Sequence, residues 1–170
     1  TGDIYYFGED VDMYDANGKV ASHEGSWMSG VNDARFGLIM PGNPKVGSRY
    51  YQEEAPKVAM DRAEIVSVSE TVKVPAGTFN NCLKTREWSP LDPVGSFEYK
   101  NYCGEHHSSQ LVLVEAHEQV LTWKYRKVHG VWVKVPSFKD VITTEELIDT
   151  DVVAPPPPSG PPFPTPGCAP

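Results

Sequence analysis

Apolar residues recur at every second position through most of this chain, and Gly, Pro, Asn and Asp interrupt them at short intervals. A period of two places successive side chains on opposite faces of a strand, whereas an amphipathic helix needs a period near 3.6. The pattern therefore predicts a mainly β fold. We expect residues 1–153 to form an antiparallel β-sandwich or a curved, half-open β-barrel.

Particular turns and connections follow from local composition. Asn17-Gly18 predicts a hairpin with a two-residue type I′ turn, and His129-Gly130 predicts a turn between the last two strands. Residues 28–44 are rich in Gly and Pro and are expected to form a long connection over one face. The segment "TTEELID" (residues 143–149) is expected to form at most one or two helical turns.

The composition changes at Ala154 to "APPPPSGPPFPTPGCAP". Proline fixes φ and lacks an amide donor, so residues 154–170 are expected to form an extended, proline-rich C-terminal arm. We expect this arm to lie against its own domain or a neighbouring subunit, with Phe163 as an anchor. Cys168 is then either a free thiol or one half of an interchain disulfide.

The other two cysteines, Cys82 and Cys103, lie in adjacent expected strands. The register that places Trp88 opposite Phe97 also places Cys82 directly opposite Cys103. Directly opposite Cβ atoms in an antiparallel pair lie about 4.5–5.5 Å apart, which permits a disulfide. A disulfide would indicate an oxidising compartment, and two buried free thiols are the alternative.

The formal net charge of −8 and pI near 5.1 argue against nucleic acid or an anionic membrane as a partner. No apolar run approaches the roughly 20 residues of a membrane span. The first residues also lack the charged start and apolar stretch of a signal peptide. If the protein is exported, we therefore expect this sequence to be the mature or trimmed form.

Three histidines, His106, His107 and His117, raise the hypothesis of a zinc-dependent hydrolase. His106 and His107 would point in opposite directions on an extended chain, and His117 lies eleven residues from His106. Only a fold-back at Ser108-Ser109 could bring them together. Zinc sites commonly include a close pair of ligands, which is missing here, so solvated loop histidines and a half-exposed strand histidine are the preferred interpretation.

The acidic stretch "GEDVDMYDANG" raises the hypothesis of a calcium site at Asp10, Asp12 and Asp15. An EF-hand loop needs Gly at its sixth position and Glu at its twelfth, and neither register provides them. A solvated, charged hairpin is the simpler interpretation, and a looser calcium site remains the alternative. No cofactor is predicted.

The sequence contains no nucleophile elbow, phosphate-binding glycine loop or metalloprotease helix motif, so a non-catalytic role is favoured and the hydrolase is kept as a further alternative. Glu87 and Glu98 are expected to face each other, and we interpret them, with Lys100 and Arg86, as a surface charge cluster. A carrier of an apolar or glycan ligand is the alternative function. Its concave sheet face would be lined by Tyr50, Trp88 and Trp123.

Three stretches resemble an uncharacterised family of exported bacterial proteins. They are "YYFGEDVDMYDANGK", "HEGSWMSGVNDARFGLIMPGNPKVGSRYYQEE", and "VSETVKVPAGTFNNCLKTREWSPLDP" followed by "FEYKNY". Together they cover roughly residues 5–102. No reaction is established for that family, so the resemblance implies export and a β-rich fold. It implies a secreted, extracellular or cell-surface location, or the periplasm.

The chain departs from the family at both ends of this region. Family members usually carry further strands before the "YYFGED" equivalent, so the first strand here is expected to lack a neighbour. We expect Ile4, Tyr5, Tyr6 and Phe7 to pair with another chain by strand addition. The leading functional hypothesis is therefore a non-catalytic structural or binding subunit of an extracellular or cell-surface assembly, as a homo-oligomer or with other protein subunits.

Overall fold

The computed structural model describes residues 2–104 and 110–148, and within these ranges the chain forms β-strands and no helix. The strands, in chain order, are β1 (Ile4–Tyr6), β2 (Gly8–Glu9), β3 (Met13–Tyr14), β4 (Val20–Ser22), β5 (Trp27–Met28), β6 (Arg35–Met40), β7 (Arg49–Tyr51), β8 (Glu53–Glu54), β9 (Arg62–Val74), β10 (Gly77–Trp88), β11 (Phe97–Cys103), β12 (Gln110–Val128) and β13 (Val131–Glu146).

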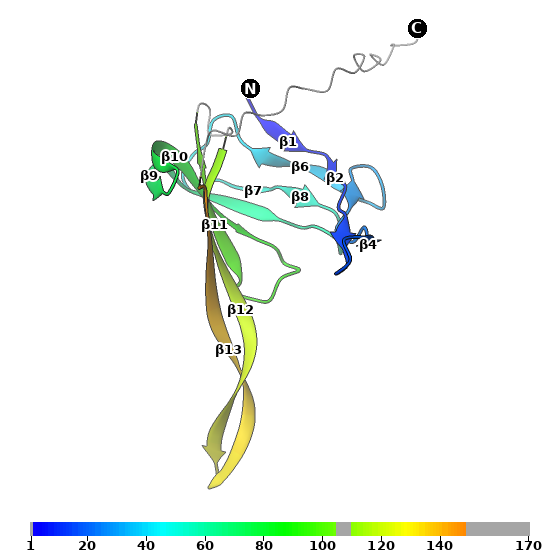
Figure 1. Cartoon of the computed structure of the whole chain (residues 1–170), viewed down its shortest axis with the longest axis vertical. Helices are drawn as coiled ribbons and strands as arrows, with labels where there is room; N and C mark the ends of the chain where they lie inside the picture. The colour runs from blue at the N-terminus through cyan, green and yellow to red at the C-terminus, as the bar shows by residue number, and fades with distance from the viewer. Residues whose placement is uncertain (1, 105–109, 149–170) are drawn as a thin grey trace.

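One antiparallel sheet of six strands, in the order β13-β12-β11-β10-β9-β7, organises the molecule. It curls into a half-barrel (Figure 1), which confirms the curved, half-open alternative rather than the sandwich. Its curvature has a local cause in β9 and β10, whose register shifts three times between Phe79 and Thr85. Such irregularities bend a strand and increase its twist.

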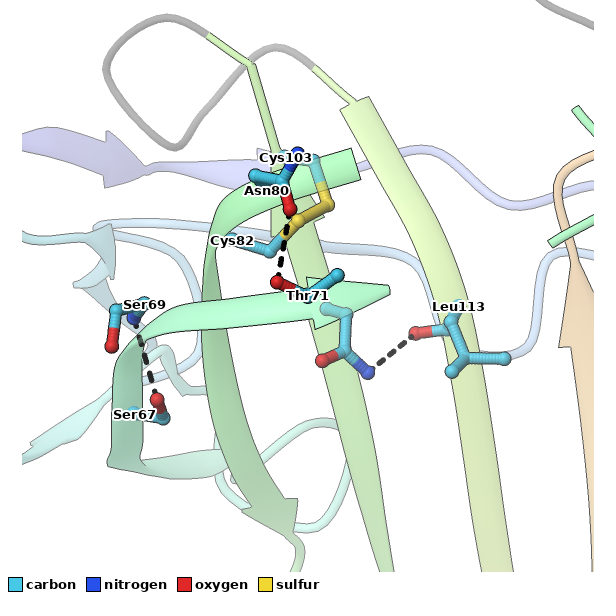
Figure 2. The surroundings of a disulfide bond; sticks show 8 residues. Ser67, Ser69, Thr71, Asn80, Cys82, Cys103 and Leu113 are labelled. Carbon is cyan, nitrogen blue, oxygen red and sulfur yellow. Dashed lines mark hydrogen bonds between the residues drawn. A yellow bond between two sulfur atoms is a disulfide. The ribbon is translucent and has the colours of Figure 1, made fainter. Parts of the chain in front are cut away.

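The pairing of β10 with β11 confirms the expected register, since Leu83 pairs with Tyr102 and Glu87 with Glu98. Cys82 and Cys103 form the predicted disulfide, with their Cα atoms 4.4 Å apart. Figure 2 shows this bond beside a hydrogen bond that Thr71 Oγ1 donates to Asn80 Oδ1 over 2.9 Å. The disulfide suggests an oxidising compartment.

Among the described residues, the core consists of three small clusters rather than one large one. The first surrounds the disulfide, the second contains Trp27, and the third joins Met40 of β6 to Ile65 and Leu83 of the large sheet. We call the sheet face that carries Ile65 and Leu83 the inner face. Because small cores contribute limited hydrophobic stabilisation, the disulfide is an important part of this fold.

Two expectations for the N-terminal third are corrected by the structure. Residues 35–40, expected within a long connection, form β6, which lies between β1 and β8 in a three-stranded sheet. The hairpin of β3 and β4 forms as expected, but only Gly18 of the Asn17-Gly18 pair has a positive φ. Asp15 O accepts from Gly18 N, and Asp15 N donates to Lys19 O, so the turn is wider than a two-residue type I′ turn.

The C-terminal half contains one long hairpin, β12 with β13. Its turn at His129-Gly130 has positive φ at both residues, which confirms the predicted turn. The expected helical turns near residue 143 are wrong, because Thr143 and Thr144 continue β13 opposite β12. β-branched residues favour a pleated strand, and the pairing with β12 satisfies their backbone groups.

The hairpin extends far beyond the sheet. β11 pairs with β12 only as far as His117, so residues 118–141 form a two-stranded projection (Figure 1). We call residues 118–141 the β-ribbon. The C-terminal arm (154–170) and its boundary at residue 153 lie outside the described residues.

Candidate functional site

A cavity of about 410 Å³ lies where the β-ribbon leaves the sheet. The loop after Trp88 borders it and is held by a 3.1 Å hydrogen bond from Gln119 N to Ser96 Oγ. Small-molecule sites commonly occupy about 300–1,000 Å³, so the cavity can hold a compact ligand. Its lining includes the acidic residues Asp61, Glu87, Asp92, Glu98 and Glu118, together with Lys100, His117, Trp88 and Phe97.

A buried carboxylate, Glu87, is among the residues that line this cavity. Its Oε1 accepts hydrogen bonds from Thr85 Oγ1 at 2.6 Å and Tyr102 Oη at 3.1 Å. Its Oε2 lies 3.0 Å from Lys100 Nζ, and the same ammonium lies 3.1 Å from Glu98 Oε2. Glu87 is only 6% exposed, so the expected surface charge cluster is instead a mostly buried hydrogen-bonded network.

Arg86 belongs to the opposite face and does not join this network. Its guanidinium lies 4.2 Å from the centre of the Phe97 ring and 5.7 Å from that of Trp88. The alternation of a strand explains the separation, because residues 86 and 87 must point to opposite faces. Lys100 alone therefore supplies the cation that offsets the two carboxylates.

The titration of the network follows from burial and charge. Burial acts to lower the pKa of Lys100, but the carboxylates of Glu87 and Glu98 outweigh it and raise this pKa above its usual range. Burial, and then the charge of Glu87, raises the pKa of Tyr102. Burial also raises the pKa of Asp61. Lys100 and Tyr102 thus keep their protons at neutral pH.

His117 lies at the outer rim of the cavity and is held by two carboxylates. Its Nδ1 is 3.1 Å from Asp140 Oδ2, and its Nε2 is 3.0 Å from Glu115 Oε1. The ring stacks on Phe97 with centroids 4.4 Å apart. Hydrogen bonds to Glu115 and Asp140 raise the pKa of His117, because an imidazolium can donate to both.

The residues of the zinc hypothesis are only partly placed. His106 and His107 lie outside the described residues, and both ring nitrogens of His117 already contact carboxylates. Across residues 2–104 and 110–148, no three His, Cys, Asp or Glu side chains are arranged to hold a metal ion. The hydrolase therefore gains no support from the placed residues.

The three aspartates of the calcium hypothesis have separate contacts. Asp12 Oδ1 lies 2.9 Å from His23 Nδ1, and Asp10 Oδ1 accepts from Ser26 Oγ at 3.4 Å. Asp15 Oδ1 accepts from the backbone N–H groups of residues 17 and 19, which lowers its pKa. These contacts agree with the interpretation of a charged hairpin.

The three aromatic residues of the carrier hypothesis do not share a site. Trp88 lines the cavity of about 410 Å³. Tyr50 packs against the core cluster of Ile65 and Leu83, and burial raises its pKa. Trp123 lies on the β-ribbon and is 54% exposed. Of the three residues, only Trp88 is therefore placed to contact a ligand in this cavity.

The first strand has a partner on one side. β1 pairs with β6, and no other described strand pairs with its second edge. Ile4, Tyr5 and Phe7 are exposed, whereas Tyr6 packs against Trp27 and donates to Glu9 over 2.9 Å. The expected strand addition stays a prediction. Phe163 and Cys168, the other expected contacts, lie outside the described residues.

The β-ribbon is a candidate functional surface that the sequence reasoning missed. Residues 119–139 contain five Lys or Arg and no Asp or Glu. Since the whole chain carries −8, the remaining residues carry −13. The signal was present as a long segment, residues 110 to 128, without the Gly or Pro that would end a strand.

One face of the β-ribbon is exposed and apolar. The pairing of Leu121 with Phe138 and of Lys127 with Trp132 places these side chains, with Trp123 and Tyr125, on the same face. The four aromatic side chains are each more than half exposed. With 150–250 Å² per ring, they present on the order of 500 Å² of aromatic surface, which is as large as the patches that mark interaction sites.

Comparisons with known proteins leave the function open. No described helix is long and apolar enough to cross a membrane. No protein-family model, curated protein or solved structure matches this chain, so its resemblance to an exported bacterial family stays a prediction.

Proposed function

We propose that this protein is a non-catalytic structural or binding subunit of a secreted or cell-surface assembly. The observation that carries this proposal is the β-ribbon, whose four exposed aromatic rings lie outside every described core cluster. An isolated two-stranded ribbon is marginally stable in water, so a partner that covers its apolar face would stabilise it. The disulfide supports a location outside the reducing cytoplasm.

The form of the β-ribbon also fits a contact surface rather than a structural extension. At about 3.3 Å per residue, the eleven residues from 118 to 128 reach roughly 36 Å beyond the sheet. Pro136 and several lysines lie on its strands, and such residues prevent indiscriminate pairing at open strand edges. Recognition would therefore use the aromatic face rather than the backbone edge.

Site-specific photo-crosslinking in cells that naturally produce the protein tests this proposal. A photoreactive amino acid replaces Trp123 on the β-ribbon, and a matched control replaces Val94, which is 98% exposed but lies in the loop before β11. We expect protein adducts at position 123 and none at position 94. A β-ribbon that yields no protein adducts would refute the proposal.

The cavity at the base of the β-ribbon favours a second candidate, an exported carrier of a glycan. Its carboxylates can accept hydrogen bonds from sugar hydroxyls, and Trp88 also borders it. The acidic lining favours a glycan over an apolar ligand. Native mass spectrometry after mild extraction tests this function, and a mass equal to the bare chain, together with no shift on adding neutral oligosaccharides, would contradict it.

A further inference from the structure

Charge is segregated within this molecule. Residues 119–139 of the β-ribbon carry five cations and no carboxylate, whereas residues 2–34 carry seven carboxylates and one lysine. Opposite charges on two surfaces accelerate their encounter and fix their relative orientation. The acidic remainder of the chain also repels polyanions, so a cationic β-ribbon on this body is better suited to an acidic protein surface.

The acidic N-terminal region contains a second cavity, of about 380 Å³. Its walls are mainly apolar and include Trp27, Met28, Val31 and Val58, and Glu9 and Asp10 provide its acidic groups. Met28 and Val31 are more than half exposed. A cavity of this size and chemistry suits one aromatic side chain accompanied by a cation.

The end of the β-ribbon offers that combination. Trp132 is 65% exposed and pairs directly with Lys127, so both side chains lie on the aromatic face close to the turn at His129-Gly130. Buried Trp residues that fill pockets are frequent hot spots of protein interfaces. A ring with an adjacent ammonium thus matches an apolar cavity that carries carboxylates.

We propose that the end of the β-ribbon of one copy docks into the N-terminal cavity of a second copy. Trp132 enters the cavity, and Lys127 meets Glu9 and Asp10. The contact requires a second copy, because the β-ribbon extends away from the N-terminal strands of its own chain (Figure 1). This inference rests on the proposed function and names the partner of the β-ribbon.

Two different surfaces meet in this contact, so a copy can use its β-ribbon and its cavity at the same time. Such a head-to-tail contact closes into a ring or dimer or continues as a chain. The disulfide and the core clusters around it and around Leu83 lie outside both surfaces, whereas the Trp27 cluster forms a wall of the cavity. Self-association therefore needs no change in the fold of the subunit.

Sedimentation equilibrium of the purified full chain provides the first test. We expect its average mass to rise with concentration in about 50 mM salt, and the association to weaken at least about tenfold in about 500 mM salt as the charges are screened. Trp132→Ser should weaken association about 30-fold, the effect expected of a hot spot. Val131→Ser changes an exposed neighbour on the opposite face and should have little effect.

Charge reversal gives a second comparison. Lys127→Glu lies on the aromatic face and should abolish association, whereas Lys124→Glu makes the same change in net charge on the opposite face. The Lys124 variant should retain most of the affinity. Equal losses in both variants would overturn the proposed contact, because they would show a response to net charge alone.

Complementation supplies the decisive test. A ribbon variant, Trp132→Ser with Lys127→Glu, keeps its cavity, and a cavity variant, Asp10→Lys with Val31→Lys, keeps its β-ribbon. Circular dichroism and urea unfolding confirm that both are folded. Each alone should remain a monomer, and a one-to-one mixture should form heterodimers. Failure of the mixture to associate would overturn the inference.

Other binding partners of the β-ribbon would give different results in these experiments. If the wild-type chain stayed monomeric but sedimented with phosphatidylglycerol vesicles, the partner of the β-ribbon would be a membrane surface, and the proposed contact with a second copy would be overturned. In the crosslinking experiment, adducts with a different protein only would overturn this inference and leave the proposed function intact. The absence of protein adducts would overturn both.

Discussion

Replacing Glu53 with glutamine should stabilise this protein at alkaline pH and leave it unchanged at acidic pH. Glu53 lies in β8, opposite Phe36 of β6, and is half-buried. Burial, and then the charges of Asp61 and Glu9, raises its pKa from 4.5 to about 7. The ionised carboxylate is therefore less favourable in the folded protein than in the unfolded chain.

The direction of the effect follows from proton binding. Because its pKa is higher in the folded state, Glu53 binds a proton more tightly in the folded protein between pH 4.5 and about 7. Its contribution to stability is intact below pH 4.5 and is lost as the pH rises to about 7. Glutamine stays neutral throughout, so the variant avoids this loss.

The size of the stability change follows from the same shift in the pKa of Glu53. At about 1.4 kcal/mol per pH unit, a change from 4.5 to about 7 corresponds to about 3 kcal/mol. The Glu53 side chain is partly exposed, so water screens its repulsion by Asp61 and Glu9 and reduces the expected gain to about 1–2 kcal/mol. We expect this gain at pH 8 and a difference near zero at pH 4.5.

Urea unfolding of the wild type and Glu53→Gln at both pH values measures the two differences in the free energy of unfolding. Glu24→Gln is the matched control, because it removes one negative charge from an exposed position. The control should change stability by less than about 0.5 kcal/mol at either pH. An equal difference for Glu53→Gln at both pH values would refute the assigned role of burial and repulsion.

Three further predictions concern other parts of the fold. Replacing Cys82 and Cys103 with alanine should lower the free energy of unfolding by about 3 kcal/mol, because the disulfide restricts the unfolded chain over a separation of 21 residues. Urea unfolding of the wild type and the variant, with and without reductant, measures this loss. Lys100→Met should destabilise by about 2–4 kcal/mol, because it leaves the buried Glu87 carboxylate without its cation. Glu98→Gln should cost less than about 1 kcal/mol, because the Glu98 side chain is 43% exposed. His117→Asn should be less stable than the wild type below pH 6.5, and this difference in stability should disappear as the pH rises through the raised pKa of His117. Thermal unfolding of both proteins from pH 5 to pH 9 measures the difference. A difference that stayed constant over this range would contradict the prediction.

The local pattern of the sequence was sufficient for the strand class, one hairpin register and one turn. The pairing of Cys82 with Cys103 followed from counting residues across a hairpin, because antiparallel partners keep a constant sum of residue numbers. The φ angles at His129-Gly130 followed from the residues that tolerate the left-handed region. Both properties depend on neighbours within one hairpin.

The candidate site required contacts between hairpins. Glu87 was expected at the surface because charged residues are rarely buried, and the structure buries it where Lys100, Thr85 and Tyr102 meet its two oxygens. These hydrogen-bond and ion-pair partners of Glu87 come from one pair of strands, but the burial of Glu87 depends on β6 packing over the inner face. Local sequence contains no information on that packing.

The sequence by itself therefore determined a β-rich chain, a disulfide and a segregated charge pattern. The tertiary structure alone decided that residues 35–40 form a strand and that residues 143–146 extend β13 instead of forming a helix. It also decided that residues 118–141 project from the sheet as a two-stranded ribbon. The physical reason is that a strand depends on its partner for its backbone hydrogen bonds. Where that partner is distant in sequence or absent, the pattern along the chain predicts a strand but not what the strand will pair with or expose.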